Sequence, residues 1–149
     1  MKLQDIFDKA AWHLMHMEGP SMDTFNDTCA YRGEHHGEFN GQMCALGAFI
    51  KDEFYHEGLE GRVMRPPMGR ASTEGALHNA VAKSIGQEKL TQDQAELFAD
   101  LQFAHDAHCA CTSDEWMDSV IKALDQIAAR HSFPFDPAHI NPQYKGEAL

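Results

Sequence analysis

Positively charged side chains are scarce in this chain. Its 149 residues include 12 Lys and Arg against 23 Asp and Glu, which gives a formal net charge of −11 with histidine neutral. Proteins that bind nucleic acid through its phosphates need a basic face, because binding is driven by release of the phosphate counterions. The composition therefore argues against direct nucleic-acid binding, and it favours partners that carry positive charge.

Long apolar runs and secretion signals are missing as well. No stretch approaches the roughly 18 apolar residues that cross a bilayer, so we expect no membrane association. Asp5 and Asp8 interrupt the apolar residues that follow Met1, and no signal-peptide core is predicted there. Without a secretion signal, the four cysteines are expected to be reduced thiols. We therefore expect a cytoplasmic protein.

Apolar residues, which make up 43% of the chain, recur mostly with helical spacing. Thr91 and Thr112 each begin a capping box, with Gln94 and Glu115 three residues later. Turn signals at Gly33 and in the Asn40-Gly41 pair separate the first helix from the rest. The pattern predicts helices over residues 3–17, 44–55, 72–85, 91–108 and 112–131.

We accordingly expect a mainly α protein, in which about five helices surround one core, with a short β-hairpin near residues 28–43. A single globular helical domain should span residues 1–131. Pro134, Pro137 and Pro142 predict an extended C-terminal tail over residues 132–149. Phe133 and Phe135 are expected to attach the start of this tail to the core.

Potential metal ligands are densest near the end of the helix predicted over residues 91–108. His105, His108 and Cys109 share one face of a helix, and zinc accepts imidazole nitrogen and thiolate sulfur in a tetrahedral shell. The spacing does not choose the fourth ligand among Cys29, Cys44, His78 and His131. The alternative is structural, because histidines in the last turn of a helix interact favourably with its dipole, and a cysteine packs as a small hydrophobe.

No complete catalytic signature is present. The chain has neither paired Cys-x-x-Cys knuckles nor a His-Glu-x-x-His arrangement. The adjacent His105 and Asp106 are also a feature of metal phosphohydrolases, but nothing around them completes such a site. A Cys29 or Cys44 nucleophile would need a base such as His35 or His36. We predict no catalytic residues and no obligatory cofactor, with a zinc-binding protein or metal-dependent hydrolase centred on His105 and the cysteines as the alternative.

Arginines gather in one predicted loop of about 16 residues that begins near Glu57. Loops of this length in compact domains are usually functional, and arginine is suited to anion recognition and docking. The alternative is that these arginines serve as counter-charges to neighbouring acidic residues. The residues predicted to contact a partner are Arg62, Arg65, Arg70, Tyr31 and Arg32.

A set of short segments follows one pattern: Cys-x-Tyr-Arg-Gly, a turn, Cys-Ala-x-Gly-x-x-Ile-x-Asp-x-x-Tyr, a Glu-Gly pair, Leu-Gln-x-x-His-Asp and a helix with tryptophan. The pattern stands here at Cys29, Tyr31, Arg32, Gly33, Cys44, Ala45, Gly47, Ile50, Asp52, Tyr55, Glu57, Gly58, Leu101, Gln102, His105, Asp106 and Trp116. It resembles a family of small uncharacterised proteins of tailed bacteriophages and prophages. The chain departs from it at Lys51, where proline is usual.

The resemblance covers residues 1–131 and implies a phage origin without implying an activity. Together with the apolar face of the helix that carries His105, it predicts that Cys29, Tyr31, Cys44 and His105 lie close together and are largely buried. Together with the acidic composition, it favours a non-enzymatic accessory protein that binds a host protein in the host cytoplasm, as an inhibitor, through an acidic surface or the arginine-containing loop.

Overall fold

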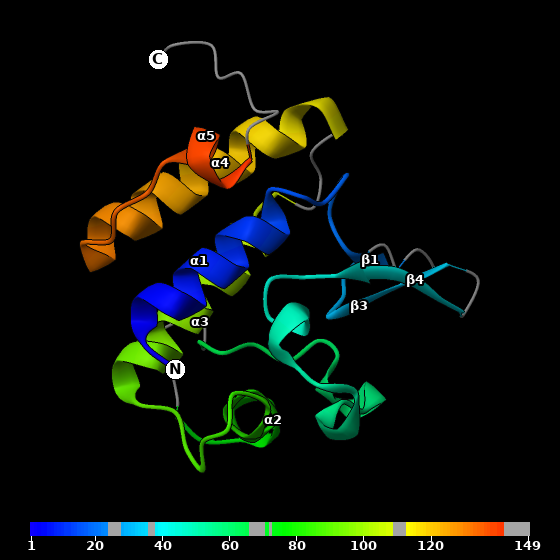
Figure 1. Ribbon diagram of the computed structural model, residues 1–149. Helices are drawn as coiled ribbons and strands as arrows, with labels where there is room; N and C mark the ends of the chain where they lie inside the picture. Colours follow the sequence, from blue (N-terminus) through cyan, green and yellow to red (C-terminus); the bar gives the residue numbers. More distant parts are fainter. Residues whose placement is uncertain (24–27, 36–37, 66–70, 72, 109–112, 142–149) are drawn as a thin grey trace.

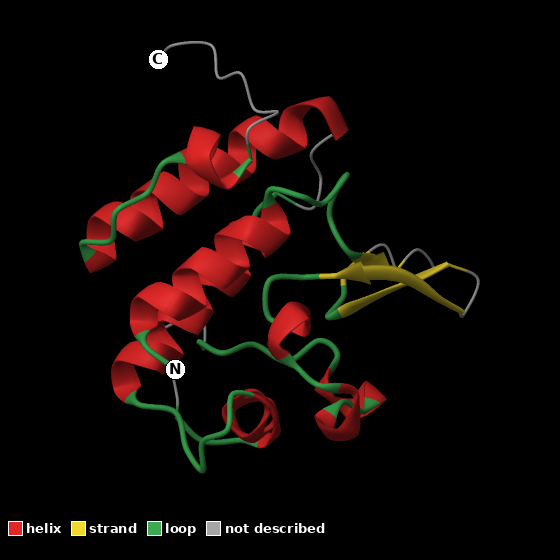
Figure 2. Ribbon diagram, in the orientation of Figure 1, coloured by secondary structure: helices red, strands yellow, loops and turns green. Residues whose placement is uncertain are grey.

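The computed structural model describes residues 1–23, 28–35, 38–65, 71, 73–108 and 113–141. The described chain is mainly α, with a small sheet beside the helices (Figures 1 and 2). None of the described helices is long and apolar enough to cross a membrane. The α-helices are α1 (Leu3–Leu14), α2 (Ala76–Ser84), α3 (Gln92–Asp106), α4 (Ser113–His131) and α5 (Pro137–Ile140).

The core forms where α1, α3 and α4 pack against one another. Ile6, Phe7 and Leu14 of α1 are fully buried, as their helical spacing predicts. The expected capping box begins α3: the Gln94 backbone N–H donates to the Thr91 hydroxyl at 3.2 Å, and the Thr91 N–H donates to the Gln94 side chain at 3.0 Å. The Thr112 of the second expected capping box lies outside the described residues.

The sheet has four strands in the order β2-β1-β3-β4: β1 (Met22–Asp23), β2 (Thr28–Cys29), β3 (Arg32–His35) and β4 (Glu38–Met43). Strands β3 and β4 form an antiparallel hairpin with Arg32 opposite Met43, which confirms the hairpin expected near residues 28–43. Strand β1 adds in parallel to β3 and antiparallel to β2. The sheet is thus larger than the predicted hairpin.

The helix expected over residues 44–55 is replaced by two short 3₁₀ turns, Gly47–Phe49 and Asp52–Phe54. Gly47 packs so closely on Tyr31 that a Cβ at this position would overlap the Tyr31 carbonyl oxygen. Lys51 then takes an extended conformation, with φ −66° and ψ 150°, and its N–H donates to the Ser84 hydroxyl at 3.0 Å. A contact distant in sequence therefore overrides the local helical pattern.

The segment after α4 returns along the core instead of extending away from it. Phe133 and Phe135 pack against the ring of Phe7, with ring centroids 5.3 and 5.6 Å away, as expected for the start of the tail. The short helix α5 follows where an extended tail was predicted. The Asn141 amide then donates to the Met15 carbonyl oxygen at 2.7 Å, which fastens this segment to the end of α1.

Candidate functional site

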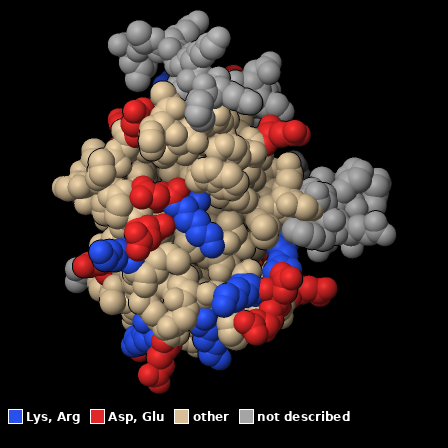
Figure 3. Space-filling model, in the orientation of Figure 1, with Lys and Arg blue, Asp and Glu red and all other residues tan. Residues whose placement is uncertain are grey.

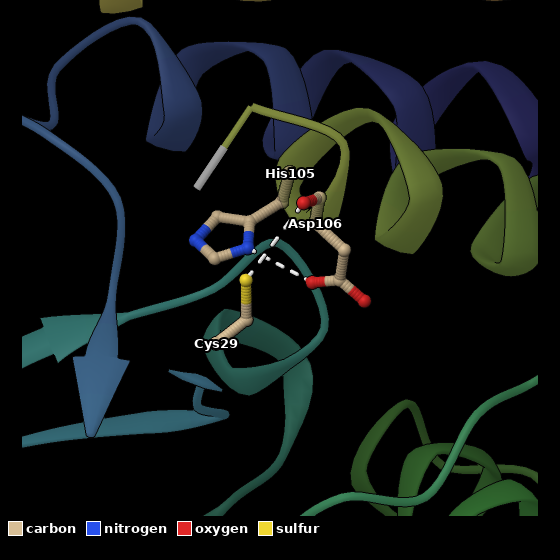
Figure 4. A group of neighbouring side chains, drawn as sticks. All are labelled: Cys29, His105 and Asp106. Atoms are coloured by element: carbon tan, nitrogen blue, oxygen red, sulfur yellow. Dashed lines mark hydrogen bonds and ion pairs between the residues drawn. The ribbon is translucent and has the colours of Figure 1, made fainter. Parts of the chain in front are cut away.

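A compact group of polar side chains lies where strand β2 meets the C-terminal end of α3 (Figure 4). Cys29, His105 and Asp106 each offer one potential ligand atom, and these atoms lie within 4.8 Å of one another. His105 is fully buried, whereas Cys29 and Asp106 are partly exposed. The Cys29 Sγ lies 3.9 Å from the backbone carbonyl oxygen of Asp106.

Hydrogen bonds fix the tautomer of His105. The backbone N–H of Ser21 donates to Nε2 at 3.0 Å, so Nε2 is an acceptor and carries no hydrogen. The ring hydrogen is therefore on Nδ1, which donates to Asp106 Oδ1 at 3.1 Å. The ring also packs edge-on against Trp116, with centroids 5.5 Å apart. Nε2 thus joins α3 to the segment that follows α1, and Nδ1 bonds to the next residue of α3 itself.

This arrangement does not fit the expected zinc site. A metal on the Nδ1 of His105 would move the ring hydrogen to Nε2, where it would face the N–H of Ser21, so that two donors would meet. Cys29 is disulfide-bonded, so its sulfur is not available as a thiolate, and the expectation of a reduced thiol is wrong at this position. The disulfide partner is not Cys44, which is a free, buried thiol.

The other expected ligands lie apart from this group. His108 lines a separate groove of about 460 Å³ between α3 and α4. Cys109 lies outside the described residues. Cys44 is near the group without belonging to it. Of the five predicted ligands, only Cys29 and His105 come together in the described part of the chain.

A cavity of about 140 Å³ adjoins the group, between β2, the end of β4 and α3. The prediction that Cys29, Tyr31, Cys44 and His105 lie close together is confirmed, since three line this cavity and the fourth lies beside Cys29; the predicted burial holds for all but Cys29, which is partly exposed. Tyr31 and Cys44 are 4% and 2% exposed. The lining residues that also belong to the sequence pattern quoted above are Cys29, Tyr31, Cys44, Gln102 and Asp106.

The two ionisable groups deepest in this cavity are held in their neutral forms. Burial raises the pKa of the Cys44 thiol to about 12, and the nearby charge of Asp106 adds to this effect. Burial likewise raises the pKa of Tyr31. The Tyr31 hydroxyl donates to the Arg62 carbonyl oxygen and accepts from the Gln102 amide at 2.9 Å. A buried thiol with a raised pKa is a poor nucleophile, which argues against the cysteine-nucleophile alternative at Cys44.

Glu60 organises the neighbouring residues, and sequence reasoning missed it. Its carboxylate accepts from the backbone N–H groups of Tyr31, at 2.9 Å, and Arg32, at 3.2 Å. It also accepts from the Tyr55 hydroxyl at 2.8 Å. The Arg32 guanidinium lies over the Tyr55 ring at 4.0 Å and pairs with Asp52 at 2.6 Å. These contacts fasten the chain after β4 onto strand β3.

The residues predicted to contact a partner are mostly engaged within the protein. Tyr31 is 4% exposed and offers little surface to a partner. Arg32 pairs with an acidic neighbour, as the counter-charge alternative predicts. Arg62 is exposed, but its Nε donates to the Gly58 carbonyl oxygen at 2.6 Å. Arg70 lies outside the described residues.

Arg65 belongs to an ionic cluster around Asp100 of α3. Arg65 pairs with Glu96 at 2.6 Å and with Asp100 at 2.9 Å. Asp100 is 8% exposed, and it also accepts from Arg130 at 2.8 Å and from His131 at 3.0 Å. The positive charge of Arg65 is therefore balanced internally. The face drawn in Figure 3 likewise carries acidic and basic side chains side by side.

Two exposed apolar side chains stand out near this cluster. Phe103 of α3 is 73% exposed and Val63 is 53% exposed, and both line a hollow of about 400 Å³. Sequence reasoning gave Phe103 no role. In the helix predicted over residues 91–108, Leu97, Leu101 and Ala104 recur at helical spacing and mark one apolar face. Phe103 lies outside that face, and an aromatic residue in such a position was the available signal.

No protein-family model, curated protein or solved structure matches the chain.

Proposed function

We propose that this chain is a non-enzymatic binding protein, a phage-type accessory factor that docks on a host protein. The docking surface consists of Val63, Phe103 and the hollow between them, and we call it the Val63–Phe103 surface. The observation that carries the proposal is the 73% exposure of Phe103 beside a second exposed apolar side chain. Aromatic anchors of this kind dominate the energetics of protein interfaces.

The backbone that presents the surface is held in place. The N–H of Met64, next to Val63, donates to the Gln102 side chain at 2.9 Å. The carbonyl of Arg62, on the other side of Val63, accepts from the Tyr31 hydroxyl. Phe103 stands on α3, whose opposite face is in the core. A surface that is ordered before binding loses little conformational entropy on docking.

The polar cluster beneath this surface supports binding over catalysis. The Cys44 thiol is buried and protonated, and both ring nitrogens of His105 are used in hydrogen bonds. An active site needs a nucleophile or base that can reach a substrate. The His105 ring instead joins α3 to the backbone at Ser21, and the Cys44 sulfur accepts from the Gly47 N–H.

Site-specific photo-crosslinking tests the proposal. The crosslinker benzoylphenylalanine would replace Phe103 in one variant and Trp12 in another, because Trp12 is a 57% exposed aromatic on α1. In bacterial lysate, position 103 should give one crosslinked partner band and position 12 should not. Val63→Ser should weaken the band. Equal crosslinking from both positions, or none from position 103, would overturn the proposal.

A further inference from the structure

We infer that the partner places a lysine or arginine side chain against Asp106, at the mouth of the cavity lined by Tyr31 and Cys44. This inference rests on the proposed docking function and specifies the chemistry of the partner. The partner would then carry a basic side chain next to an apolar one. The basic side chain would occupy the cavity, and the apolar side chain would cover the Val63–Phe103 surface.

Asp106 connects the two spaces. It is the last residue of α3 and is partly exposed. The cavity of about 140 Å³ and the hollow of about 400 Å³ share three lining residues: Val63, Gln102 and Asp106. A partner segment that covers Phe103 and Val63 therefore occupies a hollow that Asp106 also lines.

The charge of Asp106 is not balanced, in contrast to that of Asp100 on the same helix. Asp100 accepts from three basic side chains. Within the described residues, Asp106 pairs with no Lys or Arg. Its side-chain partner is the Nδ1–H of His105, and the other ring nitrogen of His105 accepts a hydrogen bond. The negative charge of Asp106 acts on the groups that line the cavity, because it helps to raise the pKa values of Tyr31 and Cys44.

The surroundings suit a cation on a flexible stem. One oxygen of Asp106 accepts from His105, and the other makes no hydrogen bond in the described part of the chain. The cavity of about 140 Å³ is large enough to admit the end of a long side chain. Charge-assisted hydrogen bonds to a carboxylate are among the strongest available at an interface.

Three arginines border this site, and the two that line the hollow are neutralised within the protein. Arg65 and Arg130, which line the hollow, are both paired with Asp100. Arg62 also lines the cavity, and its hydrogen bond to the Gly58 carbonyl oxygen does not neutralise its charge. The net charge of −11 attracts a basic segment at longer range.

The test pans a random heptapeptide display library on the immobilised full chain and measures enriched peptides by fluorescence anisotropy. We expect the enriched peptides to contain Lys or Arg beside an apolar residue. Replacing that cation with Gln should weaken binding at least about tenfold. Asp106→Asn should weaken it equally, because Asn keeps an oxygen that accepts from His105 but carries no charge.

Asp125→Asn is the matched control, since it removes the same charge from an exposed position on α4 and should change affinity less than about twofold. Asp106→Asn should not weaken the binding of the Gln-substituted peptide any further. This result would show that Asp106 and the basic residue of the peptide interact with each other. Unfolding midpoints of both variants check that they fold.

Two outcomes separate the inference from the proposed function. Peptides that require Phe103 but tolerate Asp106→Asn, or that carry acidic residues in place of Lys or Arg, would overturn the inference and leave the docking surface standing. If no peptide is enriched, or if Phe103→Ala leaves the binding of every enriched peptide unchanged, the docking surface is wrong and the inference falls with it.

Discussion

The backbone N–H of Ser21 donates a hydrogen bond of 3.0 Å to Nε2 of His105, which lies 84 residues later in the chain. This bond leaves the ring hydrogen on Nδ1, where Asp106 accepts it. His13 has the opposite arrangement, because its Nε2 donates to the Met43 carbonyl oxygen at 2.6 Å. The two histidines thus form an internal comparison of tautomers.

Long-range ¹H–¹⁵N spectra should distinguish these tautomers. At pH 7.5 we expect His105 to show a protonated Nδ1 and an unprotonated Nε2, with the reverse pattern for His13. Addition of zinc to the oxidised protein should leave the His105 pattern unchanged. A zinc-dependent exchange of the His105 hydrogen to Nε2 would restore the metal-site interpretation.

Trp116 should be a large contributor to stability. It is 1% exposed and packs against His105. Replacing it with Ala should lower the free energy of unfolding by about 3–5 kcal/mol, because a cavity remains in the core. Trp12→Ala, on the exposed face of α1, should cost less than about 0.5 kcal/mol. Denaturant melts give both values, and a loss under about 1 kcal/mol for Trp116→Ala would contradict the packing of α4.

Stability should fall as the pH drops below about 6.5. Burial lowers the pKa of His13 below its ordinary value of 6.5, opposed in part by its bond to Met43, and burial also lowers the pKa of His78. The unfolded chain then binds protons at a pH where the folded chain does not, so each proton favours unfolding.

Thermal melts between pH 5.5 and pH 8 measure this effect. The melting temperature should decrease toward pH 5.5, and His13→Gln should make the decrease shallower whatever its own effect on stability. His139→Gln, at an exposed position on α5, should leave the slope unchanged. A melting temperature that rises toward pH 5.5 would show that the sign is wrong.

Cys44 should resist alkylation in the folded protein. With a pKa of about 12, only about one Cys44 thiol in ten thousand is ionised at pH 8, and the side chain is 2% exposed. Peptide mapping by mass spectrometry after iodoacetamide treatment should find this residue unmodified in buffer and fully modified in guanidinium. Rapid modification in buffer would mean that the cavity opens readily.

The sequence correctly predicts those helices whose limits are set by residues within their own segments. The helices expected over residues 91–108 and 112–131 correspond to α3 (Gln92–Asp106) and α4 (Ser113–His131), because their apolar periodicity and end signals agree. The helix expected over residues 44–55 is absent, because the close packing of Gly47 on Tyr31 depends on a contact between separate segments. Periodicity within a window carries no information about such a contact.

The candidate site could be predicted only in part, because many of its contacts also join separate segments of the chain. The resemblance pattern placed Cys29, Tyr31 and Cys44 together, and the structure agrees. Glu60 escaped notice because two of its three partners are backbone N–H groups, which have no sequence signature. The exposure of Phe103 depends on how α3 is rotated in the fold, and its own segment does not specify that rotation.

The contact between Gly47 and the Tyr31 carbonyl has a genetic consequence. Even the single methyl group of alanine has no room there, so a saturation library at codon 47 should return only glycine among folded clones. The neighbouring codon 48, whose alanine is partly exposed, should tolerate many replacements. Two adjacent codons would then evolve under opposite constraints, although nothing in their local composition distinguishes them.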